Sequence, residues 1–422
     1  MVKNEEKYLE QCLSSLLPVL EKIDSELIIV DTGSTDNTVE IAKRYTDKVY
    51  YHSWTNNFGE MRNIVLSYAK GEWFFFLDGD EVLEDPSGVI DFFTSNKHKK
   101  FNCAGISMKN FFKSDNPDSY GLFHALRLFR NDKDFYFKGI IHEQPQAKGP
   151  AAKLDGLIIH YGYINDDKEL MEYKYKRNVE LIKKVLEETP DDIYHLFQLS
   201  QSYAMHGEYK KALEPIEKAY ELAKAKELKR YMYVLTHLAK SYFNNKEYHK
   251  VIEITQKGNK LRKGYIDLYF YQALAEFELG RLEDSIQSFT QYLYWVDQFH
   301  NGKGVIDFSV SHTSVSNHED AKAALCSILT KLGDYEEALK YGKQVSSPKA
   351  VKETIPHLTS IYFKLEQYDE LKKLLKKWDD DINLSDVIIN SIENQYLNLG
   401  EQERKTLAEL FSDKSTDYGV LN

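Results

Sequence analysis

The chain has 422 residues, which is more than one ordinary hydrophobic core accommodates, so we expect two or three domains. Its formal net charge of −11 argues against binding a nucleic acid, because such binding needs a broad basic surface. The three cysteines have neither metal-ligand nor disulfide spacing, and no apolar run is long enough to cross a membrane, so we predict a cytoplasmic protein without a membrane partner.

The first 165 residues alternate amphipathic helices with short apolar strands. Apolar periodicity predicts three helices, over 6–20, 36–42 and 58–69, and three strands, over 27–30, 48–52 and 72–77. This alternation predicts a parallel sheet with right-handed crossovers, in which ligands lie at the carboxyl ends of the strands. The loops that start at Asp31 and Asp78 are therefore where we expect the chemistry.

From about Lys168 onward the pattern is helix after helix. A short turn recurs, followed three places later by a small or apolar residue, and its fourth positions are Tyr209, Tyr248, Leu282, Tyr335 and Tyr368. A period of about 34 residues with these features resembles tetratricopeptide repeats. The wider gap before Tyr335 contains a polar insertion, residues 300–317, which predicts a long loop. We predict an all-helical domain over residues 166–422 that binds an acceptor, mediates a homodimer or only stabilises the chain.

Asp78, Gly79 and Asp80 form the central candidate site because they follow a buried aromatic strand. Two carboxylates at a strand end are costly to desolvate unless a cation or a hydrogen-bond donor meets them. Their oxygens suit Mg²⁺ or Mn²⁺, which borrow further ligands from substrate phosphates. The alternative is an acidic turn that binds nothing. The same spacing recurs in charged surroundings, where we predict solvated surface, at Asp132/Asp134 and Asp379/Asp381.

Asp31 ends a strand and is followed by small polar residues. An aspartate there can hydrogen-bond a base or a ribose, whereas the plainer interpretation is a turn with a helix cap. The loop has neither a Gly-x-Gly-x-x-Gly pattern nor a Walker lysine, which disfavours a dinucleotide site and an NTPase.

Three segments, in their order and spacing, resemble family 2 glycosyltransferases of the GT-A fold: Asn4-Glu5-Glu6, IIVDTGSTDNT from residue 28 and GEWFFFLDGDEVL from residue 71. The tetratricopeptide fusion and further marks, among them His160 with Gly162 and Tyr163, resemble the peptide S-glycosyltransferases that modify bacteriocins of the sublancin and thurandacin type. The resemblance implies a GT-A domain over residues 1–165, which is an α/β, Rossmann-like domain with a mostly parallel sheet.

The resemblance also implies roles at matching positions. Positions expected at the nucleotide sugar are Asn4, Glu6, Asp31, Arg62, Asp78 and Gly79. The expected ligands of a divalent ion are Asp80 and His160, although a lone histidine between apolar pairs is otherwise a structural core residue. Arg127 and Arg130 are expected to contact phosphate or acceptor, or to be plain surface.

The chemistry of transfer points to further residues. Cleaving a sugar from a nucleoside diphosphate builds negative charge on the departing phosphate, so a bound cation lowers the barrier. The incoming hydroxyl or thiol must lose a proton to a positioned carboxylate or histidine. His142 and Glu143 follow a strand-like segment, and we predict Glu143 as the general base, with His142 as the alternative. Direct displacement from one face predicts inversion at the anomeric carbon.

The sequence therefore predicts an inverting, metal-dependent glycosyltransferase that moves a hexose, such as glucose, from a UDP-sugar to a cysteine or serine side chain. The predicted acceptor is a peptide or protein, such as a bacteriocin precursor. One alternative is transfer to a polysaccharide or other glycan. Another is a non-catalytic tetratricopeptide adaptor with a vestigial sugar-nucleotide domain.

The expected first strand of the sheet is nearly absent, since only Met1, Val2 and Lys3 precede Asn4. We therefore expect the native product to begin some residues earlier with an apolar stretch, which intact-protein mass spectrometry would test. If the product does begin at Met1, we expect a sheet that is short there and weakened recognition of the base.

Overall fold

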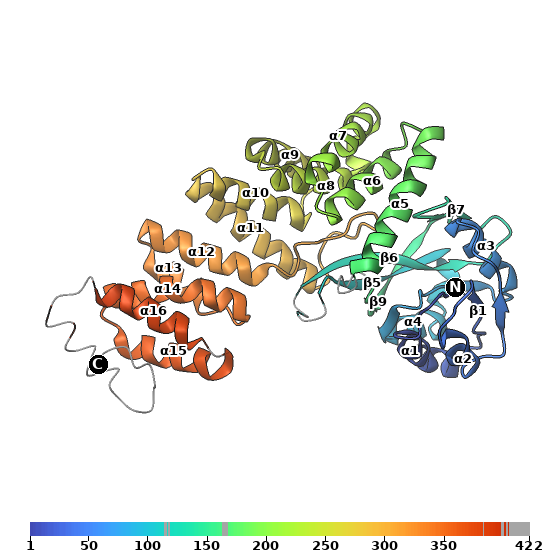
Figure 1. The fold of residues 1–422 in the computed structure, drawn as a ribbon, viewed down its shortest axis with the longest axis horizontal. Coiled ribbons are helices and arrows are strands. Elements are labelled where there is room, and N and C mark those ends of the chain that lie inside the picture. The colour runs from blue at the N-terminus through green and yellow to red at the C-terminus, as the bar shows by residue number, and fades with distance from the viewer. Residues whose placement is uncertain are drawn as a thin grey trace. The chain divides into compact units, whose positions relative to one another are not determined.

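The structure is a computed structural model that describes residues 1–113, 116, 119–162, 168–382, 384–397, 401 and 404 (Figure 1). The chain divides into two compact units. The first comprises Met1–Ala275 and Gln298–Ser316, and the second comprises Glu276–Asp297 and the described part of Asn317–Asn422. The domain boundary that we predict between residues 165 and 166 lies outside the described residues, as does Tyr163.

The first unit begins with the predicted alternation of helices and strands. Its elements up to residue 94 are α1 (Leu9–Lys22), β1 (Ile29–Asp31), α2 (Thr38–Lys43), β2 (Val49–Tyr51), α3 (Phe58–Tyr68), β3 (Trp73–Phe75), β4 (Glu81–Asp85) and α4 (Ser87–Thr94). β1 pairs with β2 in parallel, and Val2 makes a further parallel bridge to Asp31. The apolar runs of the sequence thus mark the elements correctly to within a few residues.

The main sheet is mixed, with the strand order β3-β6-β5-β9-β4. Its later strands are β5 (Cys103–Phe111), β6 (Tyr120–Arg130) and β9 (Ala151–His160), while β7 (Phe137–Lys138) and β8 (Gln144–Pro145) form a separate small pair. Only β5 and β9 run parallel; the other three pairs are antiparallel. The α/β class is confirmed, but the sheet is not mostly parallel. For β5 and β6 the reason is their short connection, which favours an antiparallel pair; β3 and β4 pair in the antiparallel sense with the later strands β6 and β9.

The main sheet has a tightly packed interior, which holds the ends of its strands in place. Ile106, Met108, Leu128 and Ile158 come from three adjacent strands, are 1% exposed or less and form one cluster with Val89 of α4. Such close packing leaves little freedom to the strands. The residues that follow β3 and β9 are therefore held at fixed positions.

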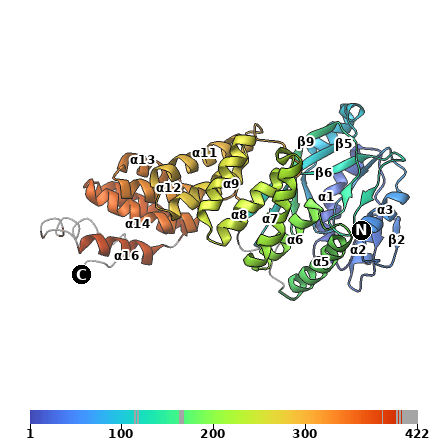
Figure 2. The same ribbon diagram turned by 90° about the horizontal axis from the view of Figure 1, so that it is seen from above.

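The described residues from 168 onward are mostly helical, which confirms the predicted class. Its helices are α5 (Lys168–Glu188), α6 (Ile193–Met205), α7 (Tyr209–Lys226), α8 (Met232–Asn244), α9 (Tyr248–Leu261), α10 (Ile266–Glu278), α11 (Leu282–His300), α12 (His318–Leu332), α13 (Tyr335–Gly342), α14 (Pro348–Lys364), α15 (Tyr368–Ile382) and α16 (Ser385–Tyr396). Within the first unit, α5, α6, α7 and α8 lie side by side in sequence order (Figures 1 and 2). Within the part of the chain that the structure describes, no helix is both long and apolar enough to span a bilayer.

The repeat turns lie where the sequence predicts them. Five helices begin at the fourth position of a predicted turn, namely α7, α9, α11, α13 and α15. The residues three places later are 1% exposed or less: Ala212, Val251, Ser285, Ala338 and Leu371. A small or apolar residue is needed there because it packs against the preceding helix.

The predicted long loop between α11 and α12 is also present, and we call residues 301–316 the strap. The strap belongs to the first unit, where His312 pairs with Leu122 of β6 through two backbone hydrogen bonds of 2.9 and 3.2 Å. Its other side is fixed to α10, because the buried carboxylate of Asp267 accepts hydrogen bonds from both Thr313 and Ser314. In Figure 1 the strap runs between the helices and the β5–β6 pair.

Candidate functional site

The loop after β1 is shaped by the carboxylate of Asp31, which is 4% exposed. Asp31 Oδ2 accepts hydrogen bonds from the backbone N–H groups of Gly33 at 3.0 Å and Ser34 at 3.1 Å. Gly33 has a φ of 102°, a conformation that glycine adopts without strain. The turn, which is the plainer interpretation of Asp31, is therefore present. The contact of Asp31 with a base or a ribose stays a prediction.

Two other predicted residues hold the same loop from outside. Asn4 Oδ1 accepts a hydrogen bond of 2.8 Å from the N–H of Thr35, and Glu6 Oε2 accepts one of 3.1 Å from the N–H of Asn37. The fold thus brings Asn4, Glu6 and Asp31 to one loop. Their side chains fix its backbone, so a nucleotide there would meet a preformed surface.

Asp78 is joined to Glu143 through Arg62 of α3. The guanidinium donates from Nη2 to Asp78 Oδ1 at 2.6 Å and from Nε to Glu143 Oε1 at 2.9 Å. The side chains of Arg62, Glu143 and Asp78 are 7%, 13% and 33% exposed. Three residues that we predict from separate segments therefore form one charged network, with Asp78 its most accessible member.

Positive charge around Asp78 decides its ionisation. Burial raises the pKa of the Asp78 carboxyl, but the guanidinium groups of Arg62 and Arg127 oppose burial and outweigh it. The pKa therefore lies well below its ordinary value, and Asp78 is a carboxylate at neutral pH. Arg62 and Arg127 both lie over the ring of Phe76, at 4.2 and 4.4 Å from its centroid.

Arg127 is not plain surface but a partner of Glu81. The two side chains form an ion pair and are only 13% and 1% exposed. Burial raises the pKa of the Glu81 carboxyl, and Arg127 opposes that shift. Glu81 also accepts a hydrogen bond of 3.1 Å from the N–H of Asp78. Arg127 thus lies beneath the Asp78 turn, where it supports the backbone of the site.

Asp80 faces a histidine instead of an arginine. His160 Nε2 lies 3.5 Å from Asp80 Oδ1, and the two side chains are 18% and 17% exposed. His160 Nδ1 lies 2.9 Å from Asn110 Oδ1, an oxygen that can only accept, so the proton is assigned to Nδ1. Burial lowers the pKa of His160, but the contact with Asp80 and the charge of Glu81 outweigh burial and raise it, so the ring also suits an ion pair with Asp80. A bound cation would instead require the neutral ring, whose Nε2 lone pair points toward Asp80.

This pair suits a divalent cation, although it is a small donor set. Among the described residues, no group of three or more histidine, cysteine, aspartate or glutamate side chains could hold a metal. Asp80 and His160 would supply one oxygen and one nitrogen ligand, and their role as ligands stays a prediction. Mg²⁺ and Mn²⁺ commonly complete their shells with water and substrate phosphate. A Cβ on Gly162 would overlap the Asp80 carboxylate and lie 2.6 Å from His160 Nε2, so a larger residue there would displace one of the two side chains.

Glu5 is a residue that our choice of site residues missed. Its Cγ lies 2.9 Å from the position that a Cβ on Gly79 would take, so its side chain covers the glycine of the Asp78 turn. Burial, followed by the charge of Asp80, raises the pKa of the Glu5 carboxyl to about 8. The signal was present, because Glu5 lies between Asn4 and Glu6, but nothing local indicated which of the three faces Asp80.

Two predicted residues lie in other surroundings. His142 has a buried Nε2 that finds no hydrogen-bond partner among the described residues, and burial, with the charges of His195 and Arg177, lowers its pKa to about 4. His142 therefore faces α5 and α6, while Glu143 turns to Arg62. Arg130 donates to two backbone carbonyls at 3.0 and 3.1 Å and lies over Trp73 at the start of β3, the opposite end from Asp78.

Of the other two Asp-x-Asp pairs, the structure describes the exposure of one. Asp132 and Asp134 are exposed, as predicted. Asp379 and Asp381 belong to α15, and their exposure lies outside what the structure describes.

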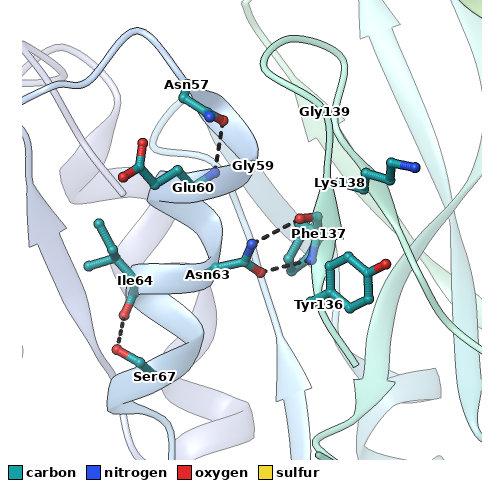
Figure 3. A pocket seen from close by; sticks show the side chains of 10 residues that line it. All are labelled: Asn57, Gly59, Glu60, Asn63, Ile64, Ser67, Tyr136, Phe137, Lys138 and Gly139. Carbon is teal, nitrogen blue, oxygen red and sulfur yellow. Dashed lines mark hydrogen bonds between the residues drawn. The ribbon is translucent and has the colours of Figure 1, made fainter. Parts of the chain in front are cut away.

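A separate pocket of about 480 Å³ lies between α3 and β7 (Figure 3). Asn63 closes one side of it, since its amide both donates to the carbonyl of Phe137 at 2.9 Å and accepts from the N–H of Phe137 at 2.8 Å. The pocket contains none of the residues predicted for the site; its lining is Asn57, Gly59, Glu60, Asn63, Ile64, Ser67, Tyr136, Phe137, Lys138 and Gly139.

Residues 1–141 match the family model described as glycosyl transferase family 2. The chain is a glycosyltransferase with a family 2 domain. The matched residues include Asp31, Arg62, Asp78 and Asp80. His142, Glu143 and His160 follow them, so that match does not extend to the predicted base or the histidine ligand.

Several known proteins are similar to parts of this chain. The SPbeta prophage-derived glycosyltransferase SunS of Bacillus subtilis strain 168 is 24% identical over 336 residues, which cover 76% of this chain and 69% of SunS. The TPR repeat-containing protein Synpcc7942_0270 of Synechococcus elongatus is 26% identical over 242 residues, 55% of this chain and 58% of that protein. The poly(ribitol-phosphate) β-N-acetylglucosaminyltransferase TarS of Staphylococcus aureus is 32% identical over 130 residues, 27% of this chain and 22% of TarS.

Proposed function

We propose that this glycosyltransferase is an inverting, divalent-cation-dependent enzyme that transfers a hexose, such as glucose, from a UDP-sugar to a cysteine or serine side chain of a peptide. The observation that carries the proposal is the pairing of Asp80 with His160 beside an Asp78 carboxylate already neutralised by Arg62. The similarity to SunS extends into the helical part, which supports an acceptor of the kind that the bacteriocin-modifying enzymes use.

In this proposal Asp80 and His160 hold Mg²⁺ or Mn²⁺, which when bound stabilises the negative charge of the departing diphosphate. Asn110 keeps the Nε2 lone pair of His160 turned toward Asp80. The loop held by Asn4, Glu6 and Asp31 receives the uridine.

Glu143 is the proposed general base. Its carboxylate is 2.9 Å from Arg62 Nε and 13% exposed, so the arginine fixes its position beside Asp78. A thiol with a free pKa of about 8.5 gives up its proton more readily than an alcohol, which favours cysteine as the acceptor at neutral pH. Glu143→Gln should keep binding of the UDP-sugar, measured by calorimetry, and lose transfer. Normal transfer by that variant would rule out Glu143 as the general base and leave His142 or another residue for that role.

A glycan acceptor is the second candidate, because TarS is a poly(ribitol-phosphate) glycosyltransferase and is 32% identical over 130 residues. The two candidates are separated by incubating the enzyme with UDP-hexoses, Mg²⁺ or Mn²⁺ and either cysteine- and serine-containing peptides or a ribitol-phosphate polymer. UDP release that needs both metal and peptide supports the first candidate. Release only with the polymer supports the second, and release that persists in EDTA removes the cation from the proposal.

The helical residues from 166 onward are proposed to bind the acceptor, to form a homodimer, or both. Light scattering of the full chain measures the oligomeric state directly. A monomer at micromolar concentration would leave acceptor binding as the proposed role of the repeats.

A further inference from the structure

Two cations of α5, Lys174 and Arg177, are half-buried without a carboxylate partner, and we call them the α5 cation pair. Among the described residues, no aspartate or glutamate oxygen lies within 4.0 Å of either charged group. Arg177 donates from Nε and Nη2 to Oδ1 of its chain neighbour Asn178, at 3.1 and 2.9 Å. That oxygen is neutral, so burial lowers the pKa of the guanidinium and no carboxylate opposes the shift.

The α5 cation pair lies on the face of α5 that packs against the glycosyltransferase domain. Leu181 belongs to a buried cluster with Ile141, and the guanidinium carbon of Arg177 lies 5.2 Å from the ring centroid of Phe58 at the start of α3. Residues three and four apart share one face of a helix. Lys174, three residues before Arg177, is therefore on this face too, about 4.5 Å nearer the start of α5.

Lys174 lies near the turn of the candidate site. Burial, followed by the charge of Asp80, raises the pKa of the Glu5 carboxyl, and the charge of Lys174 opposes that rise. Glu5 covers Gly79, since its Cγ lies 2.9 Å from the position that a Cβ on Gly79 would take. Charges are screened beyond about 10 Å, so the ammonium group of Lys174 is close to this turn.

The two arginines of the candidate site are already engaged by carboxylates. Arg62 pairs with both Asp78 and Glu143, and Arg127 pairs with Glu81. A UDP-sugar brings negative charge on both of its phosphates, and a divalent ion held by a carboxylate keeps too little charge to neutralise both. A donor bound at the turn therefore needs further positive charge, and the α5 cation pair is charge that no described carboxylate neutralises.

We propose that the α5 cation pair binds the phosphate groups of the nucleotide-sugar donor, so that the first helix of the helical part completes the donor site. This inference rests on the proposed function and deepens it, because it names residues that recognise the donor. These residues lie beyond the family 2 match, which covers residues 1–141, whereas α5 begins at Lys168. The other anion of suitable chemistry is an acidic side chain of the acceptor, and the experiment separates the two sources.

The test compares the binding of UDP with that of uridine, which lacks the phosphates. Lys174→Met and Arg177→Met each remove one charge and keep a long unbranched side chain. We expect the Kd of UDP, measured by calorimetry with Mn²⁺, to rise about tenfold in each variant, because a charge-assisted hydrogen bond to phosphate is lost. The Kd of uridine, measured by competition, should stay within twofold of wild type.

Lys176→Met is the matched control, because Lys176 belongs to the same helix, is 71% exposed and is already paired with Glu172. It should leave both Kd values unchanged. Arg177 also contacts Phe58, so the melting temperature of Arg177→Met is measured alongside. Should that variant fail to fold, Lys174→Met supplies the same test from the neighbouring turn of the helix.

Each outcome decides the inference. A Kd of UDP within twofold of wild type in both variants would overturn it while leaving the proposed function intact. Equal weakening of UDP and uridine would overturn it in favour of a structural role. A raised KM for an acidic peptide with an unchanged Kd of UDP would overturn the donor contact and assign the cations to the acceptor. If the wild-type enzyme binds neither UDP nor a UDP-sugar, the proposed function fails, and the inference fails with it.

Discussion

Asp78 and Asp80 are separated by a single glycine, yet the fold treats their carboxylates differently. Asp78 lies 2.6 Å from a guanidinium that is itself 7% exposed, so its charge is balanced from within the protein. Asp80 faces the imidazole of His160 at 3.5 Å, a contact that outweighs burial and raises the pKa of the ring, so its partner is a titratable group and not a permanent cation. The comparison separates two uses of an acidic residue, and we expect changes around Asp78 to cost stability and changes around Asp80 to cost catalysis.

The largest effect is expected at Asp80. Asp80→Ala should lower metal-dependent turnover by about 10³-fold, because the developing charge on the leaving group loses its counter-ion. The melting temperature should stay within a few degrees of wild type. The matched control is Asp134→Ala, which removes an exposed carboxylate of the same Asp-x-Asp spacing, and it should be silent in both measurements. Turnover above a tenth of the wild-type value would end the assignment of Asp80.

Arg62 tests the expectation that changes around Asp78 lower the stability of the fold. Arg62→Met leaves Asp78 and Glu143 without their shared cation, and we expect a loss of about 3 kcal/mol in the free energy of unfolding at pH 7. The folded-state pKa of Asp78 is lowered, so its contribution is present at neutral pH and is lost as the pH falls below about 4. The difference between wild type and variant should therefore narrow in acid, as measured by urea denaturation at several pH values.

Arg44→Met is the control for that experiment, since Arg44 forms an ion pair in which both side chains are about half exposed. An exposed pair contributes little, so the control should change the unfolding free energy by less than about 1 kcal/mol. Equal losses of unfolding free energy in the two variants would mean that the buried network around Asp78 stabilises the fold no more than an exposed ion pair does.

Gly162 sharpens the assignment of the cation pair without changing a charge. Gly162→Ala places a methyl group against Asp80 and His160, and we expect about a 10²-fold loss of metal-dependent turnover together with weaker Mn²⁺ binding by calorimetry. Gly71→Ala is the matched control, because its nearest neighbour there would be at an ordinary 3.4 Å. Unaltered Mn²⁺ binding in Gly162→Ala would place the cation elsewhere.

The smallest effect is expected at Cys12, which lies behind Asp78. Its buried Sγ donates to the carbonyl of Asp78 at 3.4 Å. Cys12→Ala should cost about 1 kcal/mol of unfolding free energy through lost packing and leave transfer unchanged. Ser14→Ala, on the exposed face of the same helix, should cost less. Impaired transfer in Cys12→Ala would contradict the expectation that changes around Asp78 affect stability and not catalysis.

The sequence alone predicted much of this fold because apolar spacing reports burial. The helices that begin at Tyr209, Tyr248 and Tyr335 were predicted from turns alone, and the strand before Asp78 was predicted from its aromatic run. Those signals are local, since a residue's own chemistry decides whether it is buried.

Other features depend on partners that the sequence does not pair. Arg62 and Glu143 are 81 positions apart, and nothing near either residue indicates the other. The hydrogen bond from His160 to Asn110 is equally non-local, so the orientation of that histidine could not be predicted, although its place in the motif could. The mixed sheet was missed because the alternation of helices and strands before residue 100 does not indicate the direction in which the later strands β5, β6 and β9 join the sheet.

The strap has a consequence for synthesis of the protein on the ribosome. His312 supplies the backbone partners of Leu122, and Phe308 packs against Gly105, so the catalytic sheet is covered by residues made long after it. Until residue 316 has emerged, the start of β6 presents open hydrogen-bonding groups, which are a hazard for association with other nascent chains. A truncation that ends before the strap should therefore aggregate even though every strand is present.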